Sequence, residues 1–450
     1  MSQISTENAV PFVATPIAIR RAIMSCGVGQ IFEIYDFLIY AFMAAPLARA
    51  FFPSEDPVAG LLATFATFAV GFIMRPVGAV VIGAYGDRHG RRAALVVTIG
   101  LMAVATGVIG LIPTYAAWGI AAPIILVLCR MVQGFSTGGE WGGAAAFLVE
   151  YAPSKRRGVI GSYQQAATAL GLLFATFVAY VLTVAMDPAV FAAWGWRIAF
   201  LIGFVLGPIG YYLRTQVEET PAFERAVSNR EVTRSPLRVA FTEFPTPVYA
   251  AFGVSIVGCV LNYVFLIFLP SFAQQQLHLL ASTTYLSTIV AGVIYLILTP
   301  MMGALSDRVG RKTMFFGVSG LSIVLAYPLF NLLVSYPTAG GLILTQAIAS
   351  VLLTMYTGPI CATLAEMFPT RIRFTALSVS YGFAVAIFGG FAPYIATFLI
   401  RVTGDPLAPA YYVMLAGMLS LFATFFVVER AGRPLPDEAA LLPILNERLA

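Results

Sequence analysis

GAYGDRHGRR, at Gly83–Arg92, is repeated as GALSDRVGRK at Gly303–Lys312, and each copy lies between two long apolar runs. A second motif is repeated in the same way, because EYAPSKRR at Glu150–Arg157 returns as EMFPTRIR at Glu366–Arg373. The second copies follow the first ones by 220 and 216 residues. Two motifs that recur at nearly the same offset predict that the chain is an internal duplication of two similar halves.

The composition places most of the chain in lipid. Of its 450 residues, 59% are hydrophobic and only 10% are charged, too few to cover a water-facing surface of ordinary polarity. Apolar runs long enough to cross a ~30 Å hydrocarbon core as helices recur between short polar breaks. We place twelve of them near residues 22–52, 60–84, 93–113, 120–150, 158–186, 195–213, 247–273, 280–305, 313–334, 340–367, 374–401 and 408–429. The sequence therefore predicts an all-α membrane protein with twelve transmembrane helices in two six-helix bundles related by internal duplication.

The longest stretch outside these runs divides the chain. Residues 214–246 have mixed charge, three prolines and no apolar run, which is typical of a connector between domains. We therefore expect an N-terminal bundle over residues 1–213, a cytoplasmic connector over 214–246, a C-terminal bundle over 247–430 and a cytoplasmic tail over 431–450.

Basic residues are distributed unevenly between the two ends of these spans. The end with the repeated loops collects 21 of the 26 Lys and Arg, whereas the opposite end has only Arg49, Arg197 and Arg401. Basic residues in short loops stay on the cytoplasmic side of a membrane. We therefore expect a multi-pass protein of the cell inner membrane with both termini in the cytoplasm. The net charge of +5 reflects this topology, and no basic face indicates binding to nucleic acid.

Five charged residues lie well inside the predicted spans, away from their ends, where each needs a partner or a water-filled cavity. They are Glu33 and Asp36 in the first span, Arg75 in the second, and Arg130 and Glu140 in the fourth. One interpretation is a set of static ion pairs that pin the helices together. The other is a coupling site, in which a substrate carboxylate competes with the acids for an arginine and so changes their affinity for protons. The residues alone leave both interpretations open.

The repeated loops have their own two interpretations. Each joins adjacent antiparallel helices through a sharp turn at a glycine, and its Asp can cap a helix or bind the neighbouring arginines. The loops could be simple positive-inside anchors, or they could form a latch that is made in one conformation and broken in another. Because the motif is present twice at matching places, we favour the latch, with Gly83, Asp87, Arg88, Gly90 and Arg91 in the first copy and Asp307, Arg308, Gly310 and Arg311 in the second.

These motifs resemble those of the major facilitator superfamily, whose signature loops lie between helices two and three and between helices eight and nine. The resemblance narrows to the metabolite:proton symporters through the stretches RMVQGFSTGGE at Arg130–Glu140, WGWR at Trp194–Arg197, MRP at Met74–Pro76 and AIFGG at Ala386–Gly390. Carriers of citrate or tricarballylate are the most similar, on the stretches IRVTGDP at Ile400–Pro406 and MYTG at Met355–Gly358 and the pair Tyr411 and Tyr412. The first helix departs from the usual pattern at Gln30 and Ile34, although it keeps both acids.

The resemblance implies alternating access to one central site and proton-driven uptake of a small organic acid, with citrate or a related tricarboxylate as our first expectation. Symport of 2-oxoglutarate, shikimate or a zwitterionic solute is the alternative, and drug efflux by antiport is a weaker one. On this reading Asp36, with Glu33 and Glu140, carries the proton. Four residues would bind the substrate, namely Arg75, Arg130, Asn262 and Tyr356.

Enzyme function is not expected, because no nucleophile–base pair or metal-ligand spacing lies at membrane depth. We expect neither cofactor nor metal. The expected partners are a small organic anion, protons and the lipid bilayer, and we expect the protein to act as a monomer.

Overall fold

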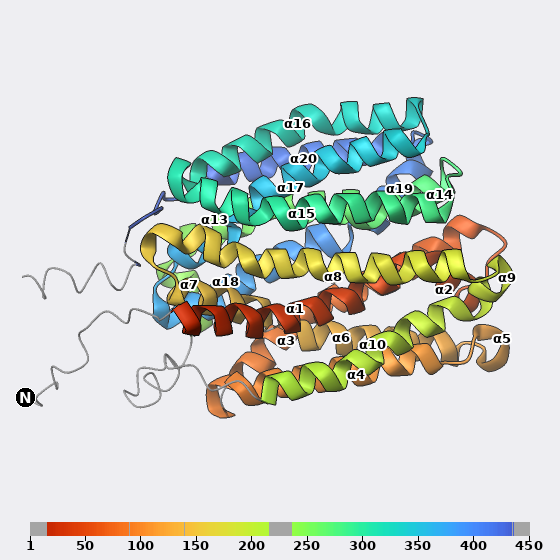
Figure 1. Ribbon diagram of the computed structural model, residues 1–450, viewed down its shortest axis with the longest axis horizontal. Helices are drawn as coiled ribbons and strands as arrows, with labels where there is room; N and C mark the ends of the chain where they lie inside the picture. The colour runs from red at the N-terminus through yellow and green to blue at the C-terminus, as the bar shows by residue number, and fades with distance from the viewer. Residues whose placement is uncertain (1–15, 90, 139, 216–235, 434, 436–450) are drawn as a thin grey trace, which may run out of the picture.

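The computed structural model describes residues 16–89, 91–138, 140–215, 236–433 and 435, and the helices among them run side by side along one axis (Figure 1). The first half contains α1 (Pro16–Phe42), α2 (Ala44–Phe51), α3 (Pro57–His89), α4 (Arg91–Leu111), α5 (Tyr115–Trp118), α6 (Ala121–Thr137), α7 (Glu140–Tyr151), the 3₁₀ turn η2 (Ser154–Arg156), α8 (Arg157–Ala185), α9 (Pro188–Val190), the π-helical η3 (Phe191–Gly195) and α10 (Trp196–Thr215).

The second half has the same character. It contains α12 (Pro236–Glu243), α13 (Pro245–Leu261), the π-helical η4 (Asn262–Phe268), α14 (Leu269–Gln275), α15 (Ala281–Val309), α16 (Arg311–Ser335), α17 (Ala339–Met367), α18 (Thr370–Ala384), the π-helical η5 (Val385–Gly390), α19 (Ala392–Thr403) and α20 (Ala408–Thr424). The short helix α12 lies within the connector that we predict over 214–246. Most of that connector and most of the tail fall outside the described residues.

The predicted set of twelve transmembrane helices is confirmed. Nine helical stretches of the described chain are long and apolar enough to cross a membrane, and the bent pair Cys26–Phe42 with Ala44–Phe51 passes the same test as one span. Two shorter apolar helices, Val96–Leu111 and Ala408–Thr424, complete the set. Each lies where the apolar runs place it.

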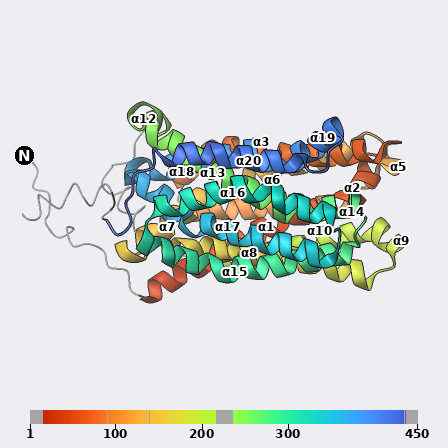
Figure 2. The same cartoon turned by 90° about the horizontal axis from the view of Figure 1, so that it is seen from above.

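The two bundles lie against each other along their length. In Figure 1 the helices coloured red to yellow-green form one bundle and those coloured green to blue form the other, with α8 running beside α15 at the boundary. On the other side of this boundary, α3 packs against α18, η5 and α19. Figure 2 shows that the short elements α2, α5, α9, α14 and α19 gather at one end, which we call the far end. We call the opposite end, where α15 meets α16 in the second repeated loop, the loop end.

Several helices are interrupted in ways that the apolar runs do not predict. The first span bends by 63° between α1 and α2, next to Met43. The seventh and eleventh spans contain the π-helical segments η4 and η5. A π-helical segment changes which side chains share a face of the helix, and such segments are frequent at functional sites. The periodicity of a wholly apolar run carries no signal of this change.

Glycines bring α3 and α6 into backbone contact. A Cβ atom on Gly134 would overlap the carbonyl oxygen of Gly71, and one on Gly138 would overlap the carbonyl oxygen of Arg75. Such contact between small residues is how helices pack closely in lipid. From their spacing of four we expect Gly134, Gly138 and Gly142 to form one groove. That expectation is wrong for Gly142, which lies in α7 and faces Ser378 of the opposite bundle.

A methyl group at Gly134 should therefore destabilise the protein. We expect Gly134→Ala to cost about 1–3 kcal/mol, because α3 and α6 must move apart or distort to admit it. Gly320→Ala is the matched control, since Gly320 lies within α16 and its Cβ would meet no atom within 4 Å. Thermal unfolding in detergent measures both. Equal melting temperatures for the two variants would contradict the close packing.

Candidate functional site

Asp36 is the most deeply buried acid in the first span. It has no exposed surface, and α1 places it opposite α4 and α6. The Thr106 hydroxyl of α4 donates to its Oδ2 atom, and the side-chain amide of Gln133 in α6 donates to the same oxygen at 3.1 Å. The carboxylate is therefore held by neutral groups from two neighbouring helices.

Gln133 also connects Asp36 to Arg130. Its Oε1 atom accepts a hydrogen bond of 2.7 Å from Nη1 of Arg130, one turn earlier on α6, and its Nε2 atom also donates to Thr106 at 2.7 Å. Arg130, Gln133, Thr106 and Asp36 thus form one hydrogen-bonded chain across three helices. Our sequence analysis identified its two charged ends but missed Gln133 and Thr106. The spacing of three between Arg130 and Gln133 was the available signal, because it places both on one face of α6.

Arg75 forms the second charged group of the site. Its Nη2 atom lies 3.7 Å from Oε1 of Glu33, which makes a long ion pair between α3 and α1. Its guanidinium group also lies between two aromatic rings, at 4.5 Å from the centre of Phe37 and 4.4 Å from that of Phe72. Cation–π contacts of this kind partly replace the water that a buried guanidinium group has lost.

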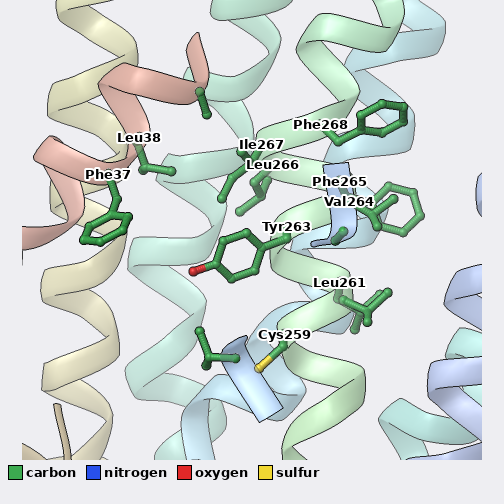
Figure 3. Close-up of a cluster of buried hydrophobic side chains, with 14 of the residues drawn as sticks. Phe37, Leu38, Cys259, Leu261, Tyr263, Val264, Phe265, Leu266, Ile267 and Phe268 are labelled. Atoms are coloured by element: carbon green, nitrogen blue, oxygen red, sulfur yellow. The ribbon is translucent and has the colours of Figure 1, made fainter. Parts of the chain in front are cut away.

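Aromatic rings from both bundles enclose the two arginines. Phe37 also lies 4.6 Å from the guanidinium group of Arg130, so one ring separates the two cations. Tyr40 at 4.5 Å and Phe68 at 5.3 Å complete the surroundings of Arg130. From the second bundle, Tyr263 of η4 contacts both Phe68 and Phe72. Figure 3 shows the Tyr263 ring reaching away from its own helix towards the side where Phe37 lies. We call Glu33, Asp36, Arg75, Arg130, Thr106, Gln133 and these rings the central site.

The second bundle needs glycine where it meets these rings. A Cβ atom on Gly389 would lie 2.8 Å from Tyr263, and one on Gly390 would overlap the ring of Phe72. Both glycines belong to η5, so this π-helical segment lets the eleventh span approach the central site. The two glycines of the AIFGG motif are therefore needed for close packing between the bundles.

Several buried polar atoms of the central site have no hydrogen-bond partner among the described residues. They are Nε and Nη2 of Arg130, Nε of Arg75 and Oδ1 of Asp36. Unsatisfied buried donors are rare in folded proteins and call for an explanation. Because two arginines keep free N–H groups beside aromatic rings, the site can receive an anionic group at the arginines and a cationic group at the rings.

The other sequence-predicted residues lie elsewhere around this site. Glu140 is buried at the start of α7, whereas Arg130 and Gln133 belong to α6. Asn262 begins η4 and is only partly buried, while its neighbour Tyr263 is the one that reaches the aromatic rings. Tyr356 donates to the carbonyl oxygen of Ser255 at 3.4 Å within its own bundle. The central site thus unites four of the predicted residues, namely Glu33, Asp36, Arg75 and Arg130.

The second repeated loop joins the two bundles at the loop end. The Asp307 carboxylate accepts hydrogen bonds from the backbone N–H groups of Gly158 and Val159, at 2.9 and 3.0 Å, and so caps the start of α8 in the opposite bundle. Arg311 holds Asp307 at 2.8 Å and Glu366 at 3.3 Å. Gly310 turns the chain with a positive φ of 96°.

In the first copy, α3 runs through Gly83 to His89 and α4 begins at Arg91. Gly90 lies outside the described residues, as do the side chains of Asp87, Arg88 and Arg91. Of the second copy, Arg308 is exposed and the other predicted members take part in the contacts above.

Further contacts between the bundles surround this latch. Arg373 forms a 2.7 Å ion pair with Glu150, and the Trp141 and Tyr381 rings stack with their centres 3.5 Å apart. Arg157 donates to the carbonyl oxygen of Arg433, beyond the last span. In that last segment burial opposes the charge of Glu429, but backbone N–H bonds, from Lys312 among others, hold the pKa of its carboxyl below the usual value.

Contacts between the bundles also close the far end. The Tyr285 hydroxyl of α15 donates to the carbonyl oxygen of Phe42 at 2.8 Å. Arg401 forms a 2.9 Å ion pair with Asp56, and both side chains are nearly half exposed. A cavity of ≈ 370 Å³ opens beside this pair, lined among others by Arg49, Asp56 and Gln275.

Comparison of the sequence with known proteins identifies a family and several similar transporters. The family described as sugar (and other) transporter matches residues 22–243 and, a second time, residues 240–440. A proline/betaine transporter of Salmonella typhimurium is 37% identical over 426 residues, which cover 93% of this chain and 85% of that protein. A glycine betaine/proline/ectoine/pipecolic acid transporter of Dickeya dadantii is also 37% identical, over 95% of this chain and 87% of its own length. A citrate-proton symporter of Klebsiella pneumoniae is 34% identical, over 91% of this chain and 92% of its own.

Solved structures show the same fold. A proton:xylose symporter of the major facilitator superfamily, bound to 6-bromo-6-deoxy-D-glucose, superposes with a TM-score of 0.78 over 94% of this chain and 98% of its own. It is 19% identical in sequence, so the likeness concerns the fold alone.

The latch geometry predicts the effect of removing one charge. We expect Asp307→Asn to weaken the loop-end seal by about 1 kcal/mol, because the neutral side chain loses the attraction to the start of α8 and to Arg311. Molecules with separated bundles at this end should become several-fold more frequent. Distances between spin labels at the exposed positions Lys155 and Arg308 measure this population.

Asp187→Asn is the matched control for this latch variant. Asp187 also caps a helix, at Ala189, but within one bundle and at the far end. Identical distance distributions for Asp307→Asn and the unmodified protein would show that the latch contributes nothing to closure.

Proposed function

The chain belongs to the sugar (and other) transporter family of the major facilitator superfamily, and from this premise we propose that it imports a small zwitterionic solute of the proline or betaine type together with a proton. Like its relatives it is a multi-pass membrane transporter and a proton-coupled symporter, not an enzyme. The substrate class, the residues that bind it and the orientation in the membrane belong to the proposal.

The proposed substrate class rests on one observation: the central site has groups that can bind an anion and groups that can bind a cation. The free N–H groups of Arg130 and Arg75 can bind a carboxylate in bidentate fashion. The rings of Phe68 and Tyr263 can hold an ammonium or quaternary ammonium group by cation–π attraction. A zwitterion of the proline or betaine type offers one group of each kind.

The relatives support this alternative over our first expectation of citrate. Proline/betaine transporters match at 37% identity, whereas the citrate-proton symporters match at 34% and 35%. Citrate remains a second candidate, because those symporters cover most of this chain and because two buried arginines suit an anion with several carboxylates. Such an anion has no cationic group that could bind to the aromatic rings of the central site.

The proposed cycle alternates between two openings. Solute and proton enter from the far end, Arg130 and Arg75 bind the carboxylate, and Asp36 takes up the proton. The loop end then parts and both leave into the cytoplasm, where the basic loops lie by the positive-inside rule. We propose that one chain performs this cycle as a monomer, with its termini in the cytoplasm.

Ligand binding tests the substrate class directly. We expect glycine betaine or L-proline to raise the melting temperature of the purified protein, since a ligand at 100 times its Kd stabilises the folded state by about 2.7 kcal/mol. Arg130→Gln should abolish this rise, whereas Arg401→Gln, at the exposed far end, should keep it. Stabilisation by citrate alone would favour the second candidate, and stabilisation by none of the three would refute both.

The role of Asp36 has a separate test in membrane vesicles. Asp36→Asn mimics a permanently protonated carboxyl group. It should lose accumulation driven by a pH gradient, because no proton can be released inside, yet keep exchange of labelled for unlabelled solute. Asp405→Asn is the control, since Asp405 lies in the loop before α20. Full pH-driven accumulation by Asp36→Asn would remove Asp36 from the mechanism and direct attention to Glu33.

A further inference from the structure

We infer that the side-chain amide of Gln133 is the positioning group that transmits the protonation state of Asp36 to Arg130, so that proton uptake releases Arg130 for the solute carboxylate. The inference rests on the proposed function, in which Asp36 carries the proton and Arg130 binds the solute. Gln133 itself is uncharged and carries no proton in this proposal.

The orientation of the Gln133 amide is fixed by its neighbours. A guanidinium group can only donate hydrogen bonds, so the atom that faces Nη1 of Arg130 at 2.7 Å must be the carbonyl oxygen Oε1. The two hydrogens of Nε2 then point to Asp36 Oδ2 and to Thr106 Oγ1. Three of the four bonding positions in the plane of the amide are used, and each of the three has a different partner.

In the part of the chain that the structure describes, Arg130 and Asp36 form no direct ion pair, and the link between them runs through Gln133. Ionised Asp36 strengthens the Nε2 bond, because a charge-assisted hydrogen bond is roughly twice as strong as a neutral one. The polarised amide in turn is a better acceptor for Arg130, since bonds in a chain reinforce one another. In the ionised state Arg130 is therefore held on α6.

Protonation of Asp36 forms one O–H bond with a proton delivered by water, and every other change in this chain is a rearrangement of hydrogen bonds. A proton on Oδ2 must donate, and Thr106 Oγ1 is its nearest acceptor. The Thr106 hydrogen can turn away to the carbonyl oxygen of Met102, which lies 2.9 Å from Oγ1. The Nε2 atom of Gln133 then loses its charge-assisted bond and keeps only neutral acceptors. Its hold on Arg130 weakens, and the guanidinium group can rotate towards a carboxylate.

Among the groups that face Asp36 in the described structure, Arg130 is the charged one. From α4 it faces Thr106, from α6 Gln133 and behind it the charge of Arg130, and from α10 the backbone at Gly203. Tyr35, its neighbour on α1, directs its own hydroxyl to the carbonyl oxygen of Ala199. Arg75 and Glu33 form their separate pair beyond Phe37.

The test compares how strongly pH controls solute affinity. In the unmodified protein, affinity for glycine betaine or L-proline should rise as pH falls, by about 5- to 150-fold in the range usual for coupled sites. In Gln133→Met, which keeps the volume but not the amide, the change should fall below about twofold. Gln133→Asn keeps the amide but is one methylene too short to reach both partners, so we expect the same loss.

Gln346→Met is the matched control. Gln346 is also fully buried and also bridges helices, since it bonds Ser287 and the carbonyl oxygen of Phe265. It contacts no charged group in the described structure, so its removal should leave the pH dependence intact. If both Gln133 variants fail to fold while Gln346→Met folds, Gln133 is a structural residue and the inference is wrong.

The outcomes separate the inference from the proposed function. Should the unmodified protein bind solute with no dependence on pH, the proposed proton coupling fails, whatever Gln133 does. A pH dependence that is equally strong in Gln133→Met overturns the inference and leaves the function standing.

A protein that binds none of glycine betaine, L-proline and citrate still allows a decision, through melting temperatures without ligand. The effects of Asp36→Asn and Arg130→Gln should be strongly non-additive with Gln133 present and at least twofold closer to additive in Gln133→Met. If the two effects are equally non-additive in Gln133→Met, Gln133 does not transmit the protonation state of Asp36 to Arg130.

Discussion

Two guanidinium groups are buried among apolar helices, and the arrangement of the whole central site follows from the need to keep them there. Placing a charge at membrane depth costs several kcal/mol or more unless it is compensated. Here the compensation is spread over a long ion pair, cation–π contacts and one amide, and among the described residues no close ion pair neutralises either arginine completely. Incomplete compensation leaves each arginine able to exchange its present partner for another anion. A fully neutralised pair would be stable but inert.

The sequence predicts the skeleton of this arrangement well. Repeated loops and apolar runs predict the duplication and the twelve spans, because both are signals of composition and spacing. Glu33, Asp36, Arg75 and Arg130 were identifiable since a charge inside an apolar run is conspicuous and expensive. Which of them meet was not predictable, because it depends on how far each helix is rotated against its neighbours.

Neutral polar residues show the limit of sequence reasoning most clearly. Gln133, Gln164 and Gln346 all lie in apolar helices and all form bonds between helices in the structure. Only the first lies between an acid and an arginine, and nothing in its immediate sequence separates it from the other two except Arg130 one turn away. Likewise Asn262 and Tyr263 are neighbours, but the π-helical start of η4 decides which of them faces the rings. The substrate class also depends on contacts that the sequence does not reveal. The resemblance of the motifs favours citrate, whereas the arginines and aromatic rings that meet in the central site favour a zwitterion.

The two ends of the molecule are sealed with unequal strength, and this has a consequence for the tempo of transport. The loop end is held by a capped helix, a 2.7 Å ion pair and stacked rings, all at least partly shielded from water. At the far end, the ion pair of Asp56 and Arg401 is nearly half exposed, and such pairs contribute only about 0.2–1 kcal/mol. The far end therefore opens at a lower cost than the loop end. In the proposed orientation, with the loop end in the cytoplasm, delivery of solute into the cell requires the stronger seal to break, and we therefore expect release, and not capture, to be the slow half of each turnover.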